Sequence, residues 1–113
     1  IITIEPDSCD DYRRNPDFIQ RYIFPGGMLP TRDHVIDHAA QVGLRPQDER
    51  GFGVDYARTL AEWRDRFLAS WPEIAALGFD DRFKRMWLYY LAYCEGGFLS
   101  GNIDVRHFAF QRG

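Results

Sequence analysis

Two histidines and a cysteine are residue types that could bind a metal ion or act as a nucleophile. His34 and His38 stand four residues apart, so on a helix both imidazoles lie on one face, as in many zinc sites. No glutamate stands beside His34 and no third ligand is evident, so Asp33 and Asp37 favour a solvated, charged face, and no metal site is predicted. Cys94 could act as a nucleophile only beside a base, and no base is patterned near it. A small buried thiol is therefore the favoured interpretation of Cys94.

Aromatic side chains at helical spacing suggest a second kind of site. Tyr90, Cys94 and Phe98 follow at steps of four, which places them on one helix face. Aromatic residues make up 16% of the chain, with three Trp, six Tyr and nine Phe. That much ring surface can build a dense core or line an apolar pocket, and spacing alone does not distinguish the two.

Length and charge limit the possible functions. The chain has 113 residues, enough for one compact domain, and a net charge of −3 at pH 7. Without a basic excess, a nucleic-acid-binding protein is not expected. No apolar run approaches the ~20 residues that span a bilayer. Cys9 and Cys94 form no disulfide framework, and we expect them as free thiols in a reducing cytoplasm.

The first half of the chain predicts short elements joined by turns. We expect a β-branched strand, a polar stretch with turn formers, a short helix, a rigid Pro-Gly-Gly turn and a second helix. Thr31 is the predicted N-cap of that helix and Gly43 its stop. A short strand and loop are then expected. The ranges are 1–4, 5–15, 17–23, 24–30, 32–42 and 44–53.

The second half predicts two long amphipathic helices and a final strand. Asp55 is the expected cap of the first helix and Gly78 its end; Asp80 or Asp81 begins the second, and Gly96-Gly97 loosens its end. The last strand, 103–110, is apolar on both faces and predicts a covered position in a sheet. The apolar positions are Tyr56, Leu60, Trp63, Phe67, Leu68, Trp71 and Ile74, then Phe83, Met86, Trp87, Tyr90, Leu91, Cys94 and Phe98.

The strands at the two ends predict a missing part of the sheet. Residues 1–4 begin in mid-strand, and the strand at 103–110 needs covered faces. We therefore expect a fragment whose N-terminal partner strands are absent. Unpaired strands would also make the chain associate with itself.

Ordered motifs over nearly the whole chain resemble those of the cyclopropane-fatty-acyl-phospholipid synthase family, S-adenosylmethionine-dependent methyltransferases that include the mycolic acid cyclopropane synthases. The motifs are DFIQRYIFPGGMLP at 17–30, YARTLAEW at 56–63, WPEI at 71–74 and FKRMWLYYLAYCEGGF at 83–98. The resemblance implies an α/β fold. Residues 1–113 would be the C-terminal part of a Rossmann-like seven-stranded methyltransferase domain, mainly helical with two to three strands, on its acyl-pocket side.

The cofactor is expected elsewhere. No Gly-rich loop follows a strand in this chain, so the S-adenosylmethionine site should lie upstream. We therefore expect that the chain alone does not transfer a methyl group.

The resemblance also implies roles for individual residues. Tyr56 would be catalytic, donating its hydroxyl to a bound bicarbonate that deprotonates a carbocation formed on the acyl chain. A phenol at a helix start suits an anion, because the helix dipole assists. Ile2 would contribute its backbone to the same bicarbonate. Without the resemblance, Tyr56 would be the first core residue of its helix. The implied acyl pocket comprises Phe24, Leu29, Leu60, Tyr90, Cys94 and Phe98.

The implied partner is an unsaturated phospholipid acyl chain, with methyl transfer to its cis double bond and closure of a cyclopropane ring. A variant that stops at simple methylation, or that uses another unsaturated lipid, would share this scaffold. Peripheral contact with the inner membrane face is compatible with this, although arginines interleaved with acidic residues favour a salt-bridged helix surface. The alternative is a free-standing module that binds a hydrophobic ligand or a partner helix without catalysis. Strands that pair within the chain, around a complete core, would favour the module.

Overall fold

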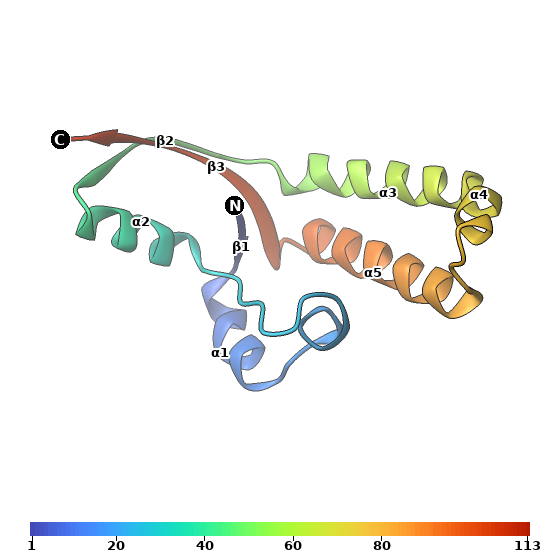
Figure 1. The fold of residues 1–113 in the computed structure, drawn as a ribbon. Helices are drawn as coiled ribbons and strands as arrows, with labels where there is room; N and C mark the ends of the chain where they lie inside the picture. The colour runs from blue at the N-terminus through green and yellow to red at the C-terminus, as the bar shows by residue number, and fades with distance from the viewer.

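The computed structural model describes all 113 residues, with a sheet at one end and a helical hairpin at the other (Figure 1). The molecule is elongated, with extents of 53 × 28 × 25 Å. The elements are β1 (Ile2–Ile4), α1 (Pro6–Arg14), the π-helical turn η1 (Ile19–Ile23), α2 (Arg32–Gln41), β2 (Leu44–Gly51), α3 (Gly53–Ala69), α4 (Trp71–Ala76), α5 (Asp81–Ser100) and β3 (Ile103–Arg112).

The strands form one antiparallel sheet in the order β1-β3-β2. Ile2 lies opposite Val105, and Leu44 lies opposite Arg112, with a bulge between Pro46 and Asp48. The predicted content of two to three strands is confirmed. The two terminal strands were predicted to lack partners within the chain. That prediction is wrong, because β1 near the N-terminus pairs with β3 near the C-terminus.

The long helices α3 and α5 pack side by side and hold the main core (Figure 1). Their apolar faces follow the predicted period. The first helix nevertheless divides at Ser70, whose carbonyl accepts hydrogen bonds from the backbone of Glu73 and Ile74, and Pro72 begins the short α4. Gly78, with φ +105°, ends α4 where a stop was predicted. The core cluster comprises Ala57, Leu60, Leu91, Cys94 and Phe98.

The caps of these helices were predicted in part. Asp80 accepts a hydrogen bond from the Phe83 amide at 2.9 Å and begins α5, as expected. Asp55 does not cap α3, because that helix begins earlier, where the Gly53 amide donates to Asp104 Oδ1 at 2.7 Å. Gly96-Gly97 does not loosen α5, which continues to Ser100.

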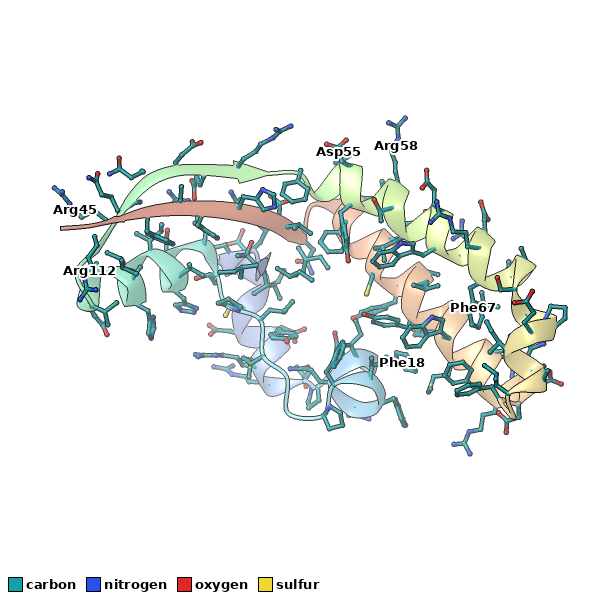
Figure 2. All side chains as sticks on the ribbon, turned by 45° about the horizontal axis from the view of Figure 1, so that its top comes forward. Phe18, Arg45, Asp55, Arg58, Phe67 and Arg112 are labelled. Atoms are coloured by element: carbon teal, nitrogen blue, oxygen red, sulfur yellow. The ribbon has the colours of Figure 1, made fainter.

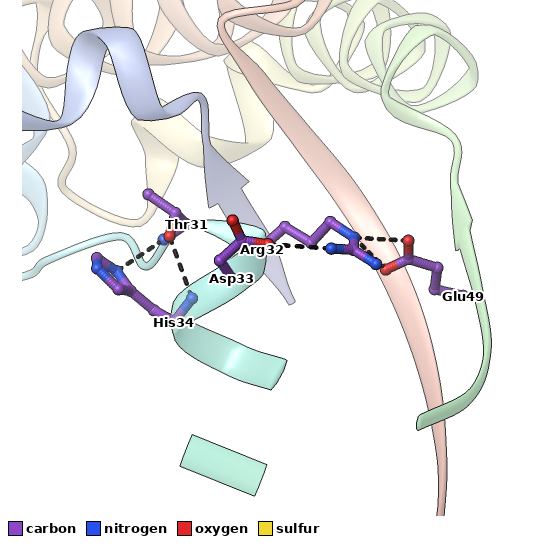
Figure 3. A network of polar contacts seen from close by, with 5 residues as sticks. All are labelled: Thr31, Arg32, Asp33, His34 and Glu49. Atoms are coloured by element: carbon purple, nitrogen blue, oxygen red, sulfur yellow. Dashed lines mark hydrogen bonds and ion pairs between the residues drawn. The ribbon is translucent and has the colours of Figure 1, made fainter. Parts of the chain in front are cut away.

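The segment 5–15 contradicts the prediction made for it, whereas the predicted cap of α2 is confirmed. The polar stretch at 5–15 was expected as turns but forms α1, with Pro6 in its first turn, where proline is tolerated. Thr31 caps α2 as predicted: its hydroxyl accepts from the His34 amide at 3.2 Å, and His34 Nδ1 accepts from the Thr31 amide at 3.2 Å (Figure 3). Next to this cap, Arg32 joins α2 to β2 through Glu49, at 2.6 Å (Figure 3).

Candidate functional site

An apolar cavity of about 300 Å³ lies between the α3–α5 hairpin and the segment formed by η1 and the turn 24–30. Every residue that the sequence analysis assigned to a site lines this cavity, from four separate parts of the chain. Those residues are Ile2, Phe24, Leu29, Tyr56, Leu60, Tyr90, Cys94 and Phe98. The remaining lining residues are Tyr12, Asp17, Ile19, Gln20, Gly27, Met28 and Ile103.

The side of the cavity formed by the hairpin, which we call the hairpin wall, consists of Tyr56, Leu60, Tyr90, Cys94 and Phe98. Leu60, Cys94 and Phe98 are buried and belong to the main core, and Tyr56 and Tyr90 pack against that core. Because helical residues four apart share a face, α3 and α5 present these side chains together. This wall is therefore a packed core that borders a gap.

Tyr56 lies in the first turn of α3, with its ring between two other aromatic rings. It meets Phe98 edge-on at 5.0 Å and Trp63 edge-on at 5.8 Å between ring centroids. Burial, and secondarily the nearby Cys94 thiol, raise the pKa of the Tyr56 phenol. The hydroxyl therefore stays protonated at neutral pH and can act as a neutral hydrogen-bond donor into the cavity.

Cys94 and Tyr90 line the same wall as protonated groups. Burial raises the pKa of the Cys94 thiol to about 11, and the charge of Asp17 acts in the same direction. A thiol in that state is a poor nucleophile at neutral pH. Burial also raises the pKa of Tyr90. Both side chains therefore act as cavity lining and not as charged groups.

Ile2 reaches the cavity from β1, with part of its backbone facing away from the sheet. Ile1 and Arg106 exchange both backbone hydrogen bonds, at 3.0 and 2.8 Å. In an antiparallel pair the next residue, here Ile2, directs its N–H and C=O to the opposite side. Those groups point to the outer edge of β1, which is not paired with another strand. On the same edge, the Ile4 amide donates to the Pro30 carbonyl at 2.9 Å.

The opposite side of the cavity, the turn wall, is formed by Phe24 and Leu29 of the turn 24–30. The Leu29 amide donates to the Tyr12 hydroxyl at 2.9 Å, and Gln20 Nε2 donates to the Gly27 carbonyl at 3.2 Å. Phe24 meets Tyr90 edge-on at 6.4 Å between centroids. This wall is therefore held largely by hydrogen bonds to side chains.

Asp17 completes the support of the turn wall and is the charged residue in the cavity lining. Its Oδ1 accepts from the Gln20 amide at 2.9 Å, and Gln20 Oε1 accepts from the Asp17 amide at 2.9 Å. Its Oδ2 accepts from the Tyr93 hydroxyl of α5 at 3.0 Å. We call this set of side chains the clasp: Tyr12, Asp17, Gln20 and Tyr93.

The clasp was not predicted from the sequence. The Asp-x-x-Gln spacing of Asp17 and Gln20, just before an apolar run, is a helix-start signal and could have identified that pair. Tyr12 carried no comparable signal, because its segment was expected to form turns. Tyr93 lies one residue from the predicted pocket residue Cys94, but on another part of the helix surface.

His34 and His38, the histidines considered as metal ligands, have other contacts in the structure. The structure contains no group of three or more His, Cys, Asp or Glu side chains placed to hold a metal ion. His34 uses Nδ1 in the cap of α2, and His38 Nδ1 lies 2.7 Å from the His34 carbonyl oxygen. None of the helices has the length and apolar character needed to cross a bilayer.

A larger, more polar groove of about 640 Å³ adjoins the cavity between α1 and α5. It shares Tyr12, Asp17, Ile19, Leu29 and Ile103 with the cavity lining. The apolar cavity and the polar groove therefore lie on either side of Tyr12 and Asp17 of the clasp.

The chain matches a known family and several characterised proteins. The family model described as mycolic acid cyclopropane synthetase matches residues 1–108. Tuberculostearic acid methyltransferase UfaA1 of Mycobacterium tuberculosis is 46% identical over 101 residues, which are 88% of this chain and 24% of that protein. Cyclopropane-fatty-acyl-phospholipid synthase of Escherichia coli is 42% identical over 96 residues, which are 85% of this chain and 25% of that protein. The chain thus spans about a quarter of the length of these relatives.

The fold also matches solved structures of cyclopropane synthases. The cyclopropane synthase MmaA2 of Mycobacterium tuberculosis superposes with a TM-score of 0.83 at 28% identity, covering 96% of this chain and 41% of that one. Mycolic acid cyclopropane synthase CmaA1, complexed with SAH and CTAB, superposes with a TM-score of 0.84 at 26% identity, covering 98% of this chain and 42% of that one.

Proposed function

Because the chain belongs to the mycolic acid cyclopropane synthetase family, we propose that it forms the acyl-binding side of an S-adenosylmethionine-dependent methyltransferase. The substrate is an unsaturated phospholipid acyl chain, modified at a cis double bond to give a cyclopropane ring. The observation that carries this proposal is that the residues implied by the family motifs line one apolar cavity. The Escherichia coli relative is a cyclopropane-fatty-acyl-phospholipid synthase, which supports this substrate class.

The cavity walls suit a reaction that passes through a carbocation on the acyl chain. Apolar and aromatic side chains exclude water, which would otherwise capture the cation. The ring faces of Tyr56, Tyr90 and Phe98 can stabilise passing positive charge. When bound, S-adenosylmethionine supplies the methyl group and bicarbonate accepts the proton released at ring closure.

The chain's own residues fit the bicarbonate. Tyr56 offers a protonated hydroxyl at the cavity wall, and Ile2 offers backbone groups on the outer edge of β1. Tyr56 orients the anion by donating a hydrogen bond, and it keeps its own proton because its pKa is raised. The match to S-adenosylmethionine is incomplete. Contrary to the sequence expectation, Gly51 and Gly53 do stand where strand β2 ends and helix α3 begins. The third glycine of a G-x-G-x-x-G cofactor loop is replaced by Tyr56, however, and β2 belongs to an antiparallel sheet.

The test of this role is Tyr56→Phe in an enzyme that carries these residues together with the cofactor-binding part. Removing one preorganised donor should lower the rate of methyl transfer by about 10²-fold. Tyr89→Phe, an exposed ring on α5 outside the cavity lining, is the matched control when activity is measured on detergent-dispersed lipid, and both variants should unfold at the same denaturant concentration as the parent. Unaltered turnover of Tyr56→Phe at low bicarbonate would exclude the assignment.

One observation favours the alternative of a free-standing binding module, and another opposes it. The terminal strands pair within the chain, as that alternative requires, but only ten residues are buried, so the core is small. We propose that residues 1–113 are the acyl-pocket part of a larger catalytic domain. Alone, the chain should bind an acyl chain and transfer no methyl group.

Assembly and location follow from the same proposal. β1 and β2 are the edge strands of the sheet, and an open edge can pair with another strand, so we expect self-association. We also propose a cytoplasmic protein with peripheral contact at the inner membrane face, where a phospholipid substrate is available.

A further inference from the structure

An exposed row of aromatic rings crosses the seam between η1 and α5. Tyr22 lies 5.3 Å from Phe18, Phe18 lies 4.6 Å from Tyr89, and Tyr89 lies 6.0 Å from Tyr93, between ring centroids. We call Phe18, Tyr22, Tyr89 and Tyr93 the aromatic row. Tyr22 is 62% exposed and Tyr89 is 53% exposed, so the row contributes little to the buried core.

The aromatic row lies beside the cavity. Tyr93 donates to Asp17, which lines the cavity. Phe24 and Met28, which follow η1 in the chain, are also exposed and at the same time line the cavity. An apolar surface therefore continues from the row to the cavity wall.

Two unpaired cations flank the row. Arg21 precedes Tyr22 in η1, and Arg85 lies one turn before Tyr89 on the same face of α5. Neither forms an ion pair within the chain; the arginines that do are Arg32, Arg64, Arg66 and Arg106. Figure 2 places Phe18 on the side of the molecule away from Asp55 and Arg58 of α3.

We propose that the aromatic row, with Arg21 and Arg85, rests on a lipid bilayer with anionic headgroups. This inference rests on the proposed function, because it supplies the cavity with its acyl chain directly from the membrane. Tyrosine suits the position, since its ring is apolar and its hydroxyl remains among the headgroups. Arginine forms bidentate hydrogen bonds with phosphate groups. Charge and chemistry together therefore match a membrane surface.

The test is flotation of the protein with vesicles of saturated phosphatidylcholine, alone or mixed with phosphatidylglycerol. Saturated lipid has no double bond, so binding is measured without catalysis. Tyr22→Ser combined with Tyr89→Ser should weaken binding to both vesicles by about tenfold. Arg21→Gln combined with Arg85→Gln should weaken binding to the mixed vesicles alone, by about 25-fold, since each cation contributes about fivefold.

Matched controls lie elsewhere on the surface. Val42→Ser removes a 71% exposed apolar side chain after α2, and Arg58→Gln removes an exposed cation on α3. Both should bind vesicles as the parent does. Equal binding by the row variants and the parent would overturn the proposal. It would also be overturned if the parent does not float and the tyrosine variants instead abolish self-association in light scattering, since the row would then be a protein contact.

Activity on detergent-dispersed unsaturated lipid separates this inference from the proposed function. The row variants should retain parental activity there, because they lie outside the cavity lining. Loss of that activity would overturn the surface role. A parent that floats with vesicles but modifies no dispersed lipid would contradict the proposed function and leave the membrane surface supported.

Discussion

The two walls of the cavity are built in different ways. The hairpin wall is part of the main core: Phe98 is 2% exposed and packs between α3 and β3. The turn wall is a short loop whose Phe24 is 58% exposed and whose backbone is held by the clasp. One wall is therefore stabilised by burial of apolar area, and the other by hydrogen bonds.

The two walls therefore differ in how easily they can move. A packed helical wall keeps the positions of Tyr56 and Cys94 nearly constant, because densely packed side chains have little room to move. A loop held by hydrogen bonds can move at lower free-energy cost, because each bond contributes only about 1 kcal/mol net. The turn wall is therefore the side of the cavity that can be displaced at the lower free-energy cost.

The largest expected effect comes from truncating each wall in turn. Phe98→Ala should lower the free energy of unfolding by about 3–5 kcal/mol, because it leaves a cavity in the core. Phe24→Ala should lower it by less than about 1 kcal/mol, because most of that ring is already in solvent. Urea denaturation of both variants measures the contrast. Equal losses would show that the walls do not differ in packing.

A larger side chain in the hairpin wall should change which acyl chains are accepted more than it changes the fold. Cys94→Phe should destabilise the protein by about 1–3 kcal/mol through overpacking, and it should also shorten the acyl chains accepted or block activity. Cys94→Val is the control of intermediate size. Product chain lengths determined by mass spectrometry provide the readout, and an unchanged profile would mean that Cys94 is core alone.

Weakening the clasp should give a smaller effect on stability. Tyr12→Phe removes the acceptor of the Leu29 amide and should cost about 1 kcal/mol. Tyr22→Phe, on the exposed aromatic row, is the matched control and should cost nothing measurable. Hydrogen exchange should show faster exchange of the Leu29 amide in Tyr12→Phe and no change near Cys94. Protection of Leu29 equal to that of the parent would argue that the turn is held in another way.

The smallest effect appears only at alkaline pH. The pKa of Cys94 is raised from 9.0 to about 11, and burial together with Asp17 raises that of Tyr93 from 10.0 to about 12. Both groups are stabilised as neutral forms, so their contributions are complete below the unfolded pKa and are lost as pH rises through the folded pKa. Stability should therefore fall from about pH 9, first at the hairpin wall and then at the clasp.

Single variants show which residue causes each of the two losses of stability at alkaline pH. Cys94→Ala should remove the loss that begins near pH 9, and Tyr93→Phe should remove the one that begins near pH 10. Thermal unfolding measured across this pH range reports both. A parent whose stability does not change between pH 9 and pH 12 would contradict the interpretation.

Local patterns predicted much of the hairpin and its wall. The period of Tyr56 and Leu60 on one helix, and of Cys94 and Phe98 on the next, was enough to place each on an inner face. Thr31 and Asp80 were recognised as caps because a cap needs only its own first turn. The family motifs then identified which of these core positions border a pocket, which periodicity alone does not distinguish.

Other features depended on contacts between distant segments. Asp55 was a reasonable cap by sequence, but Asp104 of β3 holds the start of α3 instead. Gly96-Gly97 has low helix propensity, yet α5 continues through it beside Ile103. A Cβ at Gly97 would lie 2.9 Å from Ile103 Cδ1, so that side chain would have to shift. Tertiary contact overrides weak local preference in both places.

The sequence by itself determined the helical faces, several caps and the family, because each of these depends on residues close together in the chain or on motifs read in order. Only the tertiary structure decided that β1 and β3 pair with each other, that residues 6–14 form a helix, and that Tyr12 and Tyr93 secure the turn wall. The physical reason is that the pairings of β1 with β3 and of the clasp join residues far apart in sequence. Their free energy depends on where other elements place the partners, which no local pattern records.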